Sequence, residues 1–68
     1  MTDRTQVTRI MALIRDIQHD PFAGTGKPER LRHFHGMVMS RRIDQEHRLV
    51  YVVVDDRTVV IQQARYHY

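Results

Sequence analysis

The apolar run LVYVVV at residues 49–54 constrains the fold of this 68-residue chain more than any other segment. Consecutive apolar residues rich in valine indicate a β-strand that is covered on both faces and therefore lies inside a sheet. We predict this strand over Arg48 to Val54, flanked by strands over Met37 to Ile43 and Thr58 to Tyr66. The polar segments at residues 44–46 and 55–57 are expected to form the turns of an antiparallel meander.

A helix is expected before these strands. Apolar residues recur at helical spacing from Arg4 to about His19, and Pro21 stops the pattern. Residues 20–30 are rich in glycine and proline and predict a loop, and Leu31 to His35 are a candidate for a short fourth strand. The sequence therefore predicts one α+β domain over residues 1–68, with one N-terminal helix followed by a three- to four-stranded antiparallel sheet. Because one helix covers only one face of a sheet, the other face requires a second cover.

Charge and composition narrow the classes of function. The net charge is +3 with a pI near 10.0, and basic residues concentrate between Arg30 and Arg48, which favours a polyanionic partner. A merely solvated basic surface is an equally common explanation for a charge of this size. The absence of cysteine excludes disulfides and cysteine-based zinc sites. No apolar run approaches the roughly 18 residues of a membrane span, so we expect a soluble, cytoplasmic protein.

Two segments resemble ligand-binding motifs but lack residues that such motifs need. The GTGK segment at residues 24–27 looks like a phosphate loop, but Pro28 stands where such a loop needs Ser or Thr to hold magnesium. His33 and His35 share one face of an extended segment, yet no convincing third metal ligand accompanies them. We therefore expect no nucleoside-triphosphate site, no metal site and no cofactor.

Three side chains with complementary chemistry are candidates for catalysis. Glu29 follows Gly-Lys-Pro, Arg48 follows Glu-His, and His67 lies at the end of the last expected strand. Cleavage of RNA without a metal needs a base for the 2′-hydroxyl, a cation for the pentavalent phosphate and an acid for the leaving oxygen. A carboxylate, a guanidinium and an imidazole can fill these roles, so we name Glu29, Arg48 and His67 as candidate catalytic residues.

Candidate RNA-binding residues accompany this set. Arg41 and Arg42, together with Arg32 and its basic neighbours, form a stripe that could follow a phosphate backbone. Tyr68 is the aromatic residue best suited to stacking on a nucleobase, whereas Tyr51 is expected to pack in the core or at a sheet edge.

Three segments, in this order, resemble one protein family. They are DPFAGTGKPERLRH at residues 20–33, SRRIDQEHRLVY at residues 40–51 and RYHY at residues 65–68. They are similar to the YoeB (Txe) toxins, ribosome-dependent mRNA endonucleases of bacterial toxin–antitoxin systems with a RelE/ParE-like fold. The resemblance runs from about residue 8 to residue 68. It implies that Glu29 is the base, Arg48 the transition-state cation and His67 the general acid.

The resemblance also implies supporting residues and partners. Arg32, Arg42 and Tyr68 would assist at the site, mRNA on the ribosome would be the substrate, and a YefM-like antitoxin would inhibit the protein. A homodimer is left open. Family members carry a β-strand and a helix before the helix expected here, and the chain is predicted to lack both. The alternative is a non-catalytic, truncated module that binds antitoxin or RNA.

Overall fold

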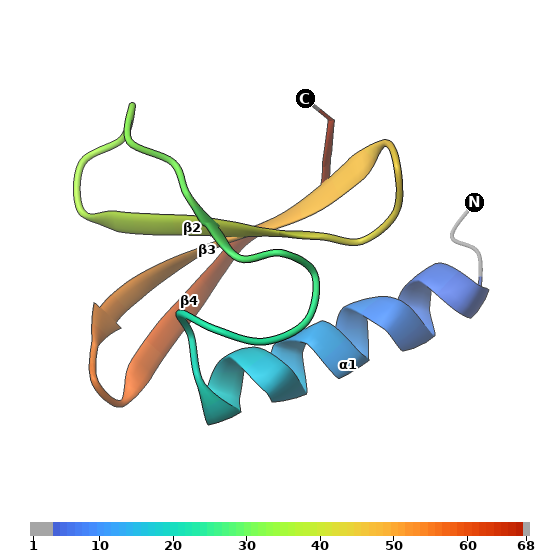
Figure 1. The fold of residues 1–68 in the computed structure, drawn as a ribbon, viewed down its shortest axis with the longest axis horizontal. Coiled ribbons are helices and arrows are strands. Elements are labelled where there is room, and N and C mark those ends of the chain that lie inside the picture. The colour runs from blue at the N-terminus through green and yellow to red at the C-terminus, as the bar shows by residue number, and fades with distance from the viewer. Residues whose placement is uncertain (1–3, 68) are drawn as a thin grey trace.

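The computed structural model of the chain describes residues 4–67, and the side chains as far as residue 62. Helix α1 (Arg4–His19) is followed by strands β1 (Glu29–Arg30), β2 (Met37–Arg42), β3 (His47–Asp55) and β4 (Thr58–His67). The strands form one antiparallel sheet in the order β1-β2-β3-β4, and α1 lies against one of its faces (Figure 1). The predicted α+β fold, one helix followed by an antiparallel sheet, is confirmed.

The two turns of the meander are closed by aspartate side chains. The Asp44 carboxylate accepts hydrogen bonds from the backbone N–H groups of Glu46 and His47, and Asp55 accepts one from the N–H of Arg57. Hydrogen bonds from backbone N–H groups two or three residues later to an aspartate carboxylate are a common way to build a turn. Pairing between β2 and β3 is uninterrupted, whereas β3 and β4 contain register shifts typical of β-bulges.

The main core lies between α1 and the sheet. Leu13 and Ile17 of α1 are buried against Met39, Leu49 and Tyr51, and Ile43 completes the cluster. The spacing of Leu13 and Ile17 by four residues places both on one side of the helix. The predicted amphipathic helix and the core position of Tyr51 are confirmed.

The fourth strand differs from the prediction. We expected it over Leu31 to His35, but β1 comprises only Glu29 and Arg30, which pair with Ser40 and Met39. The backbone N–H of Leu31 still donates to Val38, and the chain then turns through residues 32–36 to enter β2. A strand over residues 31–35 would leave no chain for that reversal.

The sheet face opposite α1 is covered only in part. Leu31, Val38 and Val50 form a second, smaller buried cluster there, with Val52 half-buried beside it. Val54, at the end of the apolar run, is exposed. The expectation that the whole run is covered on both faces therefore holds only for its first half. No helix within residues 4–67 is long and apolar enough to cross a membrane.

Candidate functional site

Glu29 and Arg48 meet on the partly covered face of the sheet. Glu29 lies opposite Ser40 in the β1–β2 pairing, and the Arg48 Nε donates a 2.9 Å hydrogen bond to the Ser40 Oγ. The Arg48 Nη2 lies 3.8 Å from the Glu29 Oε1. The side chain of Arg48 is 11% exposed and that of Glu29 is 57% exposed. The site thus combines a sheltered, oriented cation with a carboxylate that solvent and ligands can reach.

The path of β4 brings the third candidate residue toward this pair. In the register of β3 and β4, Tyr66 lies opposite Arg48 and His67 lies opposite His47. The backbone of His67 is therefore next to the strand that carries Arg48. The side chain of His67 and all of Tyr68 lie outside the described part of the structure, so their roles remain predictions.

Arg32 and Arg42 are both on the surface. Arg32 lies in the turn that follows β1, and Arg42 is the exposed last residue of β2, opposite Arg48 in the strand register. An RNA backbone at the Glu29–Arg48 pair would find Arg42 on the neighbouring strand. Both side chains are accessible, and their contacts to phosphate stay a prediction.

Arg41 is not part of the exposed basic stripe. Its side chain is completely buried. The guanidinium forms a 2.7 Å salt bridge with Asp16 of α1, and its Nε donates to the Tyr51 hydroxyl. The other hydrogen bonds of the guanidinium go to the main-chain carbonyls of Asp20, Ala23 and Thr25. A cation held in this way cannot contact RNA from the surface, and we remove Arg41 from the RNA-binding residues.

The role of Arg41 is to hold the loop at residues 20–26 against the helix and the sheet. Asp16 also accepts hydrogen bonds from the N–H and hydroxyl of Thr25. The bonds from Thr25, and then the Arg41 guanidinium, lower the pKa of Asp16 below its ordinary value. A sequence signal for the burial of Arg41 did exist. Met39 and Arg41 of β2 and Ile43 just after it occupy alternate positions, and the two apolar residues belong to the core.

A second polar cluster was missed by sequence reasoning. The Asp44 carboxylate accepts a 2.6 Å hydrogen bond from the Gln6 Nε2 and lies 3.0 Å from the His47 Nδ1. The hydrogen bond from Gln6, followed by those from the backbone N–H of Glu46 and from His47, lowers the pKa of Asp44 well below its ordinary value. The cluster ties the start of α1 to the β2–β3 turn. Within this cluster, the Asp44 carboxylate is the structural partner of the His47 ring.

A family model matches the whole chain. It describes the "YoeB-like toxin of bacterial type II toxin-antitoxin system" and aligns with residues 1–68. Among curated relatives, the "Toxin YoeB" of Streptomyces coelicolor is 54% identical over 67 residues. That alignment covers 98% of this chain and 79% of the relative.

Solved structures show the same likeness. A YoeB/ParE toxin from Agrobacterium tumefaciens superposes with a TM-score of 0.87 at 43% identity, covering 98% of this chain and 79% of that chain. Two structures from Staphylococcus aureus have a TM-score of 0.83, and each covers 98% of this chain and 77% of the other. One is a YoeB dimer at 40% identity, and the other is a heterotetrameric YoeB–YefM complex at 42% identity.

Proposed function

Because the chain belongs to the family of YoeB-like toxins of bacterial type II toxin–antitoxin systems, we propose that it is a ribosome-dependent endoribonuclease that cleaves mRNA. One observation carries this proposal. The Arg48 guanidinium is sheltered, oriented by Ser40, and 3.8 Å from the accessible carboxylate of Glu29. A preorganised cation beside a reachable base suits the attack of a 2′-hydroxyl on the neighbouring phosphate.

In the proposed reaction, Glu29 accepts the proton of the 2′-hydroxyl while its oxygen attacks the adjacent phosphorus. Arg48 stabilises the additional negative charge of the phosphorane, and His67 protonates the 5′-oxygen as the P–O bond breaks. The products carry a 2′,3′-cyclic phosphate and a 5′-hydroxyl. The proposed reaction needs no cofactor, because Glu29 accepts the proton that is removed and His67 donates the proton that is added.

The remaining surface residues would hold the RNA. Arg32 and Arg42 are exposed and can bind phosphates on either side of the Glu29–Arg48 pair. Tyr68 is proposed to stack on a base next to the cleaved bond. Substrate on the ribosome places the proposed activity in the bacterial cytoplasm.

We propose a YefM-type antitoxin as the protein partner, in keeping with the YoeB–YefM complex known for the Staphylococcus aureus relative. A homodimer is the second assembly we propose. Exposed apolar side chains offer contact area for either, since Val7 and Met11 of α1 and Ile61 of β4 are each more than a third exposed.

Primer extension on ribosome-bound mRNA tests the catalytic proposal. The Arg48→Ala variant should cleave about 100- to 1,000-fold more slowly, as expected when a transition-state donor is removed. Arg57→Ala, which removes an exposed arginine from the β3–β4 turn, is the matched control and should retain activity. An mRNA with a 2′-deoxy residue at the cut site should resist cleavage.

The alternative hypothesis is that the chain is a non-catalytic module that binds antitoxin or RNA. If the wild-type protein binds ribosomes or antitoxin but leaves mRNA intact, this result supports the non-catalytic hypothesis and overturns the proposed endoribonuclease activity. Cleavage of the 2′-deoxy substrate at the normal rate would instead refute the proposed attack by the 2′-hydroxyl.

A further inference from the structure

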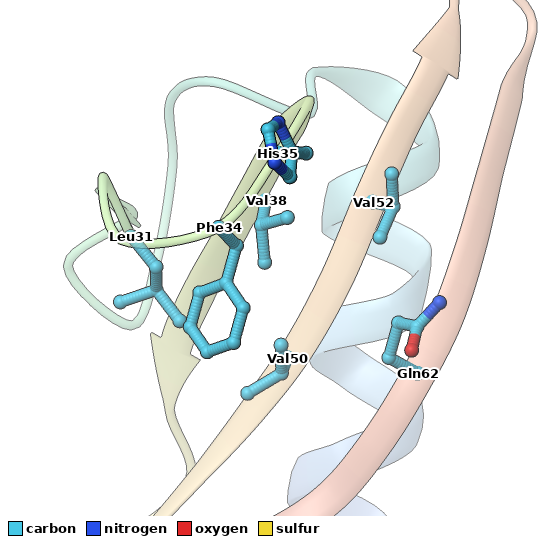
Figure 2. A pocket seen from close by; sticks show the side chains of 7 residues that line it. All are labelled: Leu31, Phe34, His35, Val38, Val50, Val52 and Gln62. Carbon is cyan, nitrogen blue, oxygen red and sulfur yellow. The ribbon is translucent and has the colours of Figure 1, made fainter.

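An apolar hollow of about 500 Å³ lies on the sheet face that carries the Glu29–Arg48 pair. Side chains alternate between the two faces of a strand, so Val50 shares its face with Arg48, and Val38 shares its face with Ser40. Figure 2 shows Val38 and Val50 on the side of the sheet turned away from α1, with the ring of Phe34 beside them. Val50 and Val38 are two residues along their strands from Arg48 and Ser40, so the hollow begins about 7 Å from the candidate catalytic pair.

The lining of the hollow combines three kinds of surface. Leu31, Val38 and Val50 supply an aliphatic floor, and Phe34 supplies an aromatic wall. His35 and Gln62 supply polar groups at the rim (Figure 2). A volume of this size is within the range of small-molecule sites, which are mostly apolar with a few polar groups that orient the ligand. A flat ligand with apolar faces and a hydrogen-bonding edge would match all three surfaces.

We propose that this hollow binds a nucleobase adjacent to the cleaved phosphodiester and thereby contributes to the choice of cleavage site. The inference rests on the proposed ribonuclease function, since it takes the phosphate to lie at Arg48. An RNA strand anchored there continues across the same sheet face, and its next base can turn into the hollow. Proteins commonly read single-stranded RNA by stacking splayed bases on aromatic rings and by hydrogen-bonding their edges.

The polar rim favours a base over an apolar side chain of a protein partner. An aliphatic side chain would fill the floor but would cover His35 and Gln62 without offering them a hydrogen bond. Covering polar groups without a partner is unfavourable, whereas the edge of a base can donate and accept. Phe34 is 54% exposed, so its ring is accessible for stacking.

A binding experiment with short RNA tests the proposal independently of cleavage. The probe is a fluorescent hexaribonucleotide with a single 2′-deoxy residue, which blocks 2′-hydroxyl attack at that position. Fluorescence anisotropy compares wild type with Phe34→Ala, and with Phe22→Ala as a control, because Phe22 is 53% exposed but lies in the loop after α1. Neither substitution removes a buried side chain, so both variants should fold.

We expect Phe34→Ala to weaken binding about 10-fold or more, the typical effect of losing one base-stacking contact, and Phe22→Ala to leave it unchanged. In a series of probes with one abasic residue moved along the strand, one position should abolish the difference between wild type and Phe34→Ala. His35→Ala should change the preference among the four bases at that same position, because it alters the edge contacts.

Three results would overturn the proposal. The first is an equal loss of RNA affinity in Phe34→Ala and Phe22→Ala. The second is a loss in Phe34→Ala that persists on every abasic probe. The third is a Phe34→Ala variant that binds RNA with unchanged affinity but binds a YefM-type antitoxin more weakly. The last result would assign the hollow to the protein partner. Failure of the proposed ribonuclease function is detected separately, as intact mRNA in the ribosome assay, and does not alter the anisotropy readout.

Discussion

Replacing Arg41 by methionine should destabilise the protein strongly, although the two side chains have similar lengths. The guanidinium is fully buried and connects Asp16 of α1, Tyr51 of β3 and the loop at residues 20–26. Methionine can fill much of the space, but it cannot donate a hydrogen bond. The substitution leaves the main-chain carbonyls of the loop without the donor that holds them.

The size of the effect follows from the burial of the partners. Removing one member of a buried ion pair usually costs about 3–5 kcal/mol, and a buried carbonyl left without a partner costs about 1–3 kcal/mol. Asp16 remains a third exposed, and the loop can open to water, which argues for the lower end of these ranges. We therefore expect a loss of about 3 kcal/mol. A chain of this length has a total stability of only about 3–10 kcal/mol.

Urea denaturation followed by circular dichroism measures this loss. At slopes of about 1–2 kcal/mol per molar urea, the midpoint should fall by about 1.5–3 M. Arg42→Met is the matched control, because Arg42 is the exposed neighbour on the same strand, and its midpoint should change little. Equal midpoints for Arg41→Met and wild type would refute the assignment of Arg41 as the residue that holds the loop.

Three further predictions concern other features. Gly26 and Gly36 have φ values of +83° and +80°, but a Cβ at Gly26 would lie 2.9 Å from the Leu13 side chain, while nothing lies within 4 Å at Gly36. Gly26→Ala should therefore lower the melting temperature more than Gly36→Ala, and equal losses would refute tight packing there. The pKa of Asp44 is lower in the folded chain than in the unfolded chain, so on acidification the carboxylate is protonated in the unfolded chain at a higher pH than in the folded chain. The free energy of unfolding therefore falls as the pH drops below about 3.8. Asp44→Asn should make the acid limb of a stability curve shallower, and an unchanged limb would refute this linkage. Arg42→Gln should reduce the slope of log affinity for RNA against log salt concentration by about 1, whereas Arg15→Gln on the outer side of α1 should not.

Several features of the molecule follow from local sequence patterns. The helix at Arg4–His19 and the strands β2, β3 and β4 agree with the bounds predicted from their apolar patterns to within a residue or two. This agreement has a physical basis, because burial on one face repeats every 3.6 residues in a helix and every second residue in a strand.

Other features depend on residues that are distant in the chain. The alternation of residues 39, 41 and 43 places Arg41 on the core side, but its burial depends on Asp16 and on loop carbonyls that lie 16 to 21 residues before it. The short β1 likewise depends on how the turn before β2 is closed.

By itself, the sequence determined the helix, the meander and the types of side chain available for chemistry, because short-range periodicity encodes them. Only the tertiary structure decided which arginine lies beside Glu29, which one supports the loop, and where the apolar hollow lies. The reason is that a buried charge or an open hollow is created by partners that chain folding brings together, and no local pattern specifies those partners.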